Sequence, residues 1–146
     1  MNQVVVKQEK SGYQIVEAYK SLRTNLQFCG EDKKVIAVTS CTPNEGKSSV
    51  SMQLGISLAE SGKRVILIDA DLRKSVLLGR TKTQKSVRGL AHFLSGQATL
   101  EDVICSTNVK NFYMIYSGPF PPNPAELLGG KNFRSLLNAL RKVYDY

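Results

Sequence analysis

Short apolar runs that alternate with amphipathic stretches constrain the fold of this chain more than any other feature. Three such runs have the length of β-strands and lack polar alternation: residues 35–38, 65–68 and 112–116. Continuous apolar runs predict strands that are buried on both faces of a parallel sheet. Between the first two runs, apolar residues recur every three or four positions, which predicts a helix that ends near Gly62. Strand, helix and strand in this order predict a right-handed βαβ unit, and hence an α/β fold with helices on both faces of a parallel sheet.

Further helices are predicted on either side of this unit. A helix over residues 12–28 has one apolar stripe, and the spacing of Thr99 and Asp102 predicts a capping box before a short helix. Residues 117–130 contain four of the five prolines, which predicts an extended loop that ends in a short turn. A last helix is predicted over residues 132–146. The apolar stripe of the first helix comprises Ile15, Tyr19, Leu22 and Leu26, and the inward positions of the last comprise Phe133, Leu136, Leu137 and Leu140.

Composition excludes several classes of protein. The 146 residues suffice for one domain, and no apolar run reaches the roughly 18 residues of a membrane span. The N-terminus lacks the apolar stretch of a signal peptide, and the three cysteines form no C-x-x-C pair, so we expect a cytoplasmic chain without a zinc site. The net charge of +8 is scattered along the chain. We therefore interpret it as a solvated basic surface and expect no nucleic-acid partner.

The segment after the first apolar run has the pattern of a P-loop, Cys41-Thr42-Pro43-Asn44-Glu45-Gly46-Lys47-Ser48. Cys41 stands where the motif has glycine, and Asn44 stands where many related loops have glycine, although asparagine tolerates left-handed backbone better than most residues. Lys47 is expected to reach the β- and γ-phosphates of ATP, and the Ser48 hydroxyl is expected to bind Mg²⁺. The residues predicted to surround the phosphates are Asn44, Glu45, Gly46, Lys47, Ser48 and Ser49.

Two carboxylates follow the second apolar run, at Asp69 and Asp71. Because side chains alternate along an extended chain, both are expected on one side of the strand, at the carboxyl edge of the sheet where α/β proteins bind ligands. Two acids at this place would repel each other unless a cation lay near them. We therefore predict that Asp69 and Asp71, with Ser48, hold the Mg²⁺ that accompanies ATP.

Four ordered motifs together make the chain resemble the bacterial tyrosine kinases of capsule and exopolysaccharide synthesis. The P-loop matches that family's P-G-E-G-K-S/T with Asn44 in place of glycine, and residues 66–73 match three apolar residues followed by D-x-D-x-R. Residues 89–96 match Gly-Leu-x-x-x-Leu-x-Gly, and residues 122–128 match Pro-Asn-Pro-x-Glu-Leu-Leu. The resemblance extends over roughly residues 15–146. It implies a P-loop kinase that transfers phosphate from Mg-ATP to tyrosines of neighbouring subunits.

The resemblance also implies an assembly. Family members form rings through a helical E-x-x-R-x-x-R motif, which Glu17, Lys20 and Arg23 match with lysine at the middle position. They work with a membrane-embedded activator, a polysaccharide co-polymerase, so the kinase would lie at the inner face of the membrane. Residues 1–30 would then be an oligomerisation helix and residues 34–146 the nucleotide-binding core of a single domain.

The chemistry assigns roles to the three charged residues at the site. A tyrosine hydroxyl has a pKa near 10 and needs a proton acceptor, for which Asp71 is the candidate. Asp69 would be the Mg²⁺ partner through a bound water, although the sequence equally allows the two aspartates to exchange roles. Lys47 would stabilise the charge on the transferred phosphoryl group.

The family pattern includes a Walker B strand with a terminal aspartate, expected after Tyr146 and beside the P-loop strand, and a tyrosine cluster beyond it. We therefore expect an incomplete domain that folds poorly and is nearly inactive by itself. Two alternatives to the kinase remain. One is an ATPase switch like the ParA and MinD proteins of partition and division-site selection, although their signature lysine is replaced by Thr42. The other is a catalytically dead interaction module that assembles through its first helix.

Overall fold

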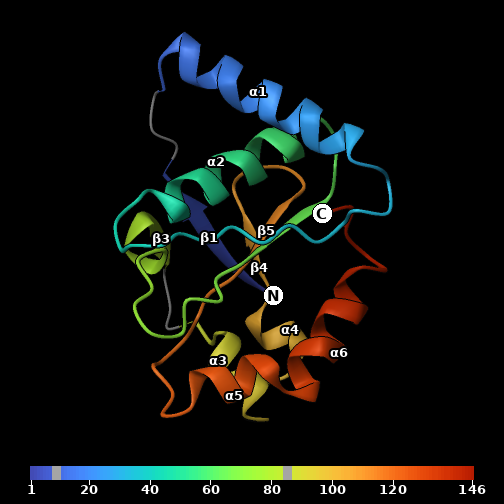
Figure 1. The fold of residues 1–146 in the computed structure, drawn as a ribbon. Helices are drawn as coiled ribbons and strands as arrows, with labels where there is room; N and C mark the ends of the chain where they lie inside the picture. The colour runs from blue at the N-terminus through green and yellow to red at the C-terminus, as the bar shows by residue number, and fades with distance from the viewer. Residues whose placement is uncertain (8–10, 84–86) are drawn as a thin grey trace.

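The computed structural model describes residues 1–7, 11–83 and 87–146. In these described ranges, one five-stranded sheet lies between two groups of helices (Figure 1). The strands are β1 (Asn2–Val6), β2 (Val65–Ile68), β3 (Thr81–Thr83), β4 (Cys105–Thr107) and β5 (Phe112–Ile115). The helices are α1 (Tyr13–Phe28), α2 (Lys47–Glu60), α3 (Leu90–Leu94), α4 (Leu100–Val103), α5 (Pro124–Gly129) and α6 (Lys131–Leu140), with a 3₁₀ turn η1 (Leu78–Arg80).

The sheet is mixed, with strand order β2-β5-β4-β1-β3. β2 and β5 run parallel, with Val65 opposite Phe112 and Ile68 opposite Ile115, and β1 and β4 are also parallel. The pairs β1·β3 and β4·β5 are antiparallel. The α/β class predicted from the sequence is thus confirmed, and the sheet is mixed, with two parallel and two antiparallel pairs. The turn at Asn108–Asn111 is too short for a crossover helix, so it reverses the chain between β4 and β5.

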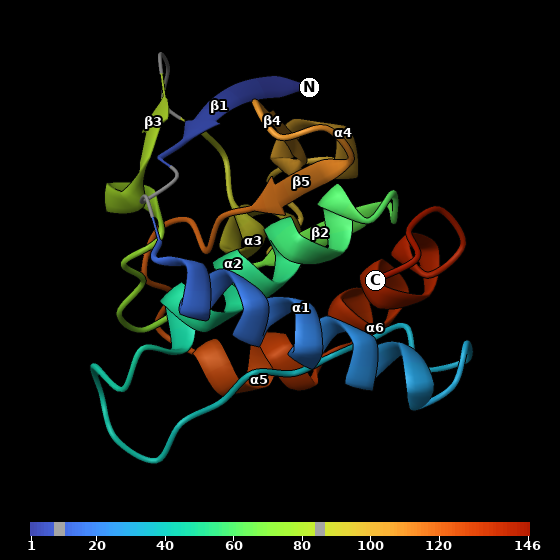
Figure 2. The same ribbon diagram turned by 90° about the horizontal axis from the view of Figure 1, so that it is seen from above.

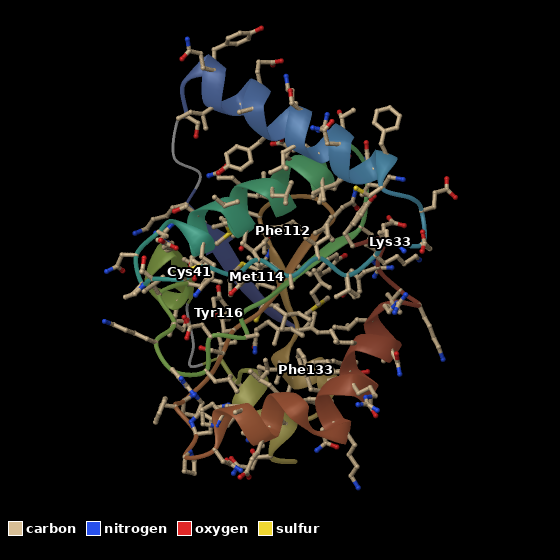
Figure 3. All side chains as sticks on the ribbon, in the orientation of Figure 1. Lys33, Cys41, Phe112, Met114, Tyr116 and Phe133 are labelled. Carbon is tan, nitrogen blue, oxygen red and sulfur yellow. The ribbon has the colours of Figure 1, made fainter. Side chains whose placement is uncertain are left out.

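Helices cover both faces of the sheet, as predicted. α2 lies on one face, with α1 outside it, and α3 to α6 lie on the other (Figure 1); seen from above, α1 crosses in front of α2 (Figure 2). Phe112 and Met114 point from β5 toward α2, while Ile115 points toward α3 and α6. Figure 3 shows Phe112 and Met114 in the middle of the molecule and Phe133 at the α6 side. The alternation along β5 therefore divides the apolar core into two parts, one on each face.

The predicted strand at residues 35–38 is the main error of the sequence interpretation. The structure describes these residues as irregular chain, and Val35 and Ile36 are 51% and 36% exposed. A cavity of about 590 Å³ separates this segment from β2. A strand forms only where a neighbouring strand exchanges backbone hydrogen bonds, and apolar side chains alone do not supply them.

The end of the chain lies beside the free edge of β2. Tyr146 N donates to Arg64 O over 3.3 Å, and Ile66 N donates to Tyr146 O over 3.1 Å. The Tyr144 side chain is buried, its ring lies 5.4 Å from that of Tyr113, and the Arg64 guanidinium lies over both rings. The predicted last helix therefore ends at Leu140, and the residues after it turn toward the sheet.

Helix α1 is more exposed than its apolar stripe predicts. Tyr19 and Leu26 pack against the buried cluster that includes α2, but Ile15 and Leu22 are 51% and 39% exposed. The helix rests on one other helix, because the sheet is already covered by α2 (Figure 1). Among the described residues, no helix has both the length and the apolar character that crossing a membrane requires.

Several local predictions are confirmed. Asn44 adopts φ 64°, and Gly62 follows α2 with φ 90°. In the capping box, Asp102 N donates to Thr99 Oγ1, and Thr99 N donates to Asp102 Oδ2 over 2.9 Å. Strand β1 was not predicted, and it lies inside the sheet between β4 and β3. The backbone at Asn44 and Gly62 and the capping box at Thr99 depend on local chemistry. The place of β1 depends on strands that are distant in the sequence.

Candidate functional site

The P-loop leads directly into the first turn of α2. Gly46 caps this helix with a left-handed backbone, φ 88°, and Lys47, Ser48 and Ser49 are its first three residues. A helix of 14 residues has a positive N-terminal end and free backbone amides there, which favour an anion. Cys41 lies in the exposed loop ahead of the helix (Figure 3). The order of loop and helix is therefore that of a phosphate-binding turn.

The Glu45 carboxylate folds back onto the beginning of the loop. Its Oε2 accepts hydrogen bonds from Cys41 N over 3.1 Å and from Thr42 N over 3.3 Å. Hydrogen bonding from the side chain and backbone of Thr42 lowers the pKa of Glu45. Glu45 thus shapes the loop, a role that its position at the start of a helix did not reveal.

Lys47 and Asp71 bring the two motifs together. Lys47 Nζ donates to Asp71 Oδ2 over 3.2 Å, and both side chains are about one-third exposed. Asp71 Oδ1 accepts from Arg73 N and Lys74 N, at 3.3 and 3.0 Å. The hydrogen bond from Lys74 N, followed by the Lys47 contact, lowers the pKa of Asp71. The carboxylate is therefore fixed and ionised at neutral pH.

Asp69 has a different environment, although it lies only two residues away. It is 6% exposed, its Oδ1 accepts from Asp71 N over 3.2 Å, and its Oδ2 accepts from the Ser75 hydroxyl. Burial raises the pKa of Asp69 despite these hydrogen bonds. Because burial disfavours the charged form, a nearby cation would stabilise this carboxylate.

One cavity gathers four of the predicted site residues. Lys47, Ser48, Asp69 and Asp71 all line it, although they come from two segments of the chain. The rest of its wall is largely apolar and is formed by residues 35–38, α2, β2 and α6. Asn44, Glu45, Gly46 and Ser49 lie in the adjoining loop and first turn of α2.

The predicted interface residues on α1 do not share one environment. Lys20 Nζ and Glu17 Oε1 form an exposed ion pair at 2.8 Å. Arg23 turns toward α2, where its Nη1 donates to Ser57 O over 2.8 Å. Its guanidinium thereby anchors α1 to α2 within the chain.

The donor atoms at the site suit magnesium. The Ser48 hydroxyl and the Asp69 and Asp71 carboxylates are oxygen donors, the kind that Mg²⁺ prefers. Across the described ranges there is no group of three or more His, Cys, Asp or Glu that could hold a metal by itself. The oxygens of Ser48, Asp69 and Asp71 are therefore the candidate donors for such an ion.

Two residues near the site were not predicted. Ser75 donates to Asp69, and Arg80 Nη1 donates to the hydroxyl of Ser49 in α2. Both belong to the segment that leaves β2 and returns to the start of α2. The sequence gives little indication of either residue. Both lie outside the motifs, and the sequence does not show where the segment that carries them turns back toward α2.

The comparisons with known proteins agree with this geometry. Residues 33–146 match the AAA domain family. The chain belongs to this family. It is also 45% identical over 130 residues to the tyrosine-protein kinase CpsD of Streptococcus pneumoniae serotype 4, covering 89% of this chain and 57% of that protein. The chain thus spans about half the length of the curated relatives that it matches.

Solved structures show the same likeness. The BceF tyrosine kinase domain has a TM-score of 0.80 at 43% identity, covering 89% of this chain and 52% of that one. The kinase domain of the Escherichia coli tyrosine kinase ETK has a TM-score of 0.84 at 29% identity, covering 97% and 65%. The resemblance to bacterial tyrosine kinases that the motifs indicated is therefore confirmed.

Proposed function

We propose that this chain is the nucleotide-binding part of an ATP-dependent protein-tyrosine kinase that regulates capsule or exopolysaccharide synthesis. The observation that carries the proposal is the contact between Lys47 and Asp71, which joins the P-loop to the D-x-D strand end at one cavity. The similarity to tyrosine-protein kinases supports the choice of tyrosine as the acceptor.

The residues divide the work of phosphoryl transfer. The amides at residues 44–49 and the N-terminus of α2 bind the phosphates, and Lys47 leaves Asp71 to contact the β- and γ-phosphates. Asp71 accepts the proton of the attacking tyrosine hydroxyl, because its side chain is the more accessible of the two carboxylates. The accessibility of Asp71 supports this choice, since a base must lie within reach of the proton before its pKa matters.

Magnesium belongs to the same proposal. Ser48 and Asp69 would hold it, with Asp69 acting through a bound water, and Asp71 would lie close by. When bound, the ion neutralises charge on the phosphates during transfer. The burial that raises the pKa of Asp69 would be offset by the ion, so this carboxylate would be charged in the loaded site.

Assembly is the remaining part of the proposal. The α1 helix, within residues 1–30, would contact a second copy in a ring, with the exposed Glu17 and Lys20 at the interface. Arg23 would support this surface by holding α1 on α2. A membrane-embedded activator would bring the ring to the inner face of the membrane, while residues 34–146 bind ATP.

Incubation with γ-labelled ATP and Mg²⁺ tests the proposal. Label on tyrosine supports the kinase, whereas free phosphate without labelled protein supports the alternative ATPase switch. Calorimetry that detects no nucleotide binding contradicts both and favours an interaction module.

Lys47→Ala gives the quantitative test. Removing a positive charge from the transferred phosphoryl group lowers catalysis by about 100- to 1,000-fold. We expect this loss in the rate of tyrosine phosphorylation, with the circular dichroism spectrum unchanged because Lys47 is partly exposed. Lys63→Ala at an exposed position is the matched control, and an equal loss there would contradict the assignment.

A further inference from the structure

Arg80 lies beside the N-terminus of α2, although none of the sequence motifs includes it. It is the last residue of η1, and its Nη1 donates to the hydroxyl of Ser49, the third residue of α2. Ser49 is one of the residues predicted to surround the phosphates. The guanidinium is therefore beside the first turn of the helix to which the nucleotide would bind.

The backbone that carries Arg80 is fixed on both sides. Leu77 is 4% exposed and belongs to the core beneath α2, and Thr81 is 7% exposed. The Tyr116 hydroxyl on the sheet side donates to Thr81 Oγ1 over 2.7 Å, and Thr81 Oγ1 donates to Leu78 O over 3.2 Å. The position of Arg80 is thus set by the core, while its side chain extends over α2.

The charge of Arg80 is not neutralised within the described part of the chain, where no carboxylate forms an ion pair with it. A guanidinium has five N–H donors in a planar fork, which suits two oxygens of one phosphate. A neutral serine hydroxyl uses only a small part of this capacity. Arg80 is exposed, so a polyanion at the start of α2 would take the place of water at the remaining N–H donors.

We propose that Arg80 is a nucleotide-binding residue that contacts the α- and β-phosphates. This inference rests on the proposed function, since it requires a nucleotide in the P-loop. Lys47, paired with Asp71, marks the γ-phosphate end, and Ser49 lies two residues farther along the helix. Arg80 would therefore recognise the phosphates that ATP and ADP share.

Calorimetric titration with Mg-ATP and with Mg-ADP tests this assignment on the unchanged chain, Arg80→Gln and Arg80→Lys. Loss of a charge-assisted hydrogen bond to phosphate weakens binding by about 10- to 100-fold. We expect such a loss in Arg80→Gln for both nucleotides alike, and a smaller loss in Arg80→Lys, which keeps the charge without the fork. The salt dependence of binding should also become weaker in Arg80→Gln.

Arg88→Gln is the matched control, because Arg88 is also exposed and donates one hydrogen bond, to Gln97 O. It should leave both affinities unchanged. If Arg80→Gln binds both nucleotides as tightly as the unchanged chain, or loses affinity for ATP only, the inference about Arg80 is wrong. The proposed function is not affected by either result. A lower unfolding midpoint of nucleotide-free Arg80→Gln would show a structural clip between η1 and α2 and would also overturn it. Failure of the unchanged chain to bind either nucleotide contradicts the proposed function itself.

Discussion

The two segments that carry the nucleotide motifs are supported in opposite ways. Residues 65–81 begin in β2, which pairs with β5 over four residues, and then wrap around Asp69 and Asp71 with hydrogen bonds from their own backbone and from Ser75. Residues 33–46 form no helix or strand, Val35 and Ile36 within them are exposed, and the segment leads directly into α2.

Both segments nevertheless meet at one cavity, through Lys47 and Asp71. The carboxylate side of the site is held by a strand ladder and a buried core, while the phosphate side is held by a helix terminus. The loop at residues 41–46 is held by the hydrogen bonds to Glu45 and by its entry into α2, while residues 35–38 before it form no helix or strand.

A matched pair of valines tests this contrast with the largest expected change in stability. Val65 in β2 is 4% exposed and Val35 is 51% exposed. Truncating a buried valine to alanine removes apolar contacts and leaves a cavity, so Val65→Ala should lower the free energy of unfolding by about 1–3 kcal/mol. Val35→Ala should change it by less than about 0.5 kcal/mol. Urea unfolding of both variants measures the difference, and equal effects would show that residues 35–38 are packed as tightly as β2.

The two aspartates sharpen the contrast within one segment. The Asp71 carboxylate accepts hydrogen bonds from Lys47 Nζ, Arg73 N and Lys74 N. Asp71→Asn weakens these hydrogen bonds, so it should lower the free energy of unfolding at pH 7 by about 1–2 kcal/mol. Asp69→Asn should have a smaller effect, because the lost hydrogen bonding is offset by removing a buried charge.

The pH dependence separates these variants further. The pKa of Asp71 is lowered by folding, so its stabilisation is present above the ordinary carboxyl range and is lost as the pH falls through the folded value. The pKa of Asp69 is raised, so its ionisation destabilises the fold at neutral pH. This penalty begins to shrink as the pH falls below the raised folded value, and it is gone below the ordinary carboxyl range. When the free energy of unfolding is measured at several pH values from 7 down to 3, the difference between Asp71→Asn and the unchanged chain should become smaller. A growing gap would contradict the lowered pKa.

The smallest expected effect concerns the loop itself. Asn44 has φ 64°, a left-handed backbone that asparagine and glycine adopt more readily than alanine. Asn44→Ala should lower the free energy of unfolding by about 1 kcal/mol, and Asn44→Gly should change it by less than about 0.5 kcal/mol. Thermal unfolding of the two variants side by side checks this. If alanine is tolerated as well as glycine, the loop before α2 is even less constrained than the comparison indicates.

Most of the site could be predicted because its parts are close in the sequence. The order of loop and helix at residues 39–49 and the spacing of Asp69 and Asp71 predict where phosphate and magnesium would bind, and the structure lines one cavity with Lys47, Ser48 and both acids. The roles of Ser75 and Arg80 escaped prediction, because the turn that returns them to the site is shaped by the core around Leu77.

The sequence by itself determined the local features: the α/β class, the helix after the P-loop, the capping box at Thr99 and the left-handed backbone at Asn44. These depend on side-chain periodicity and on hydrogen bonds over a few residues. The tertiary structure alone decided that β1 joins the sheet, that Arg23 turns toward Ser57 and that residues 35–38 remain outside the strand ladder. It also gave Asp69 and Asp71 opposite pKa shifts. The physical reason is the same in each case, since backbone pairing and burial depend on partners that lie far away along the chain.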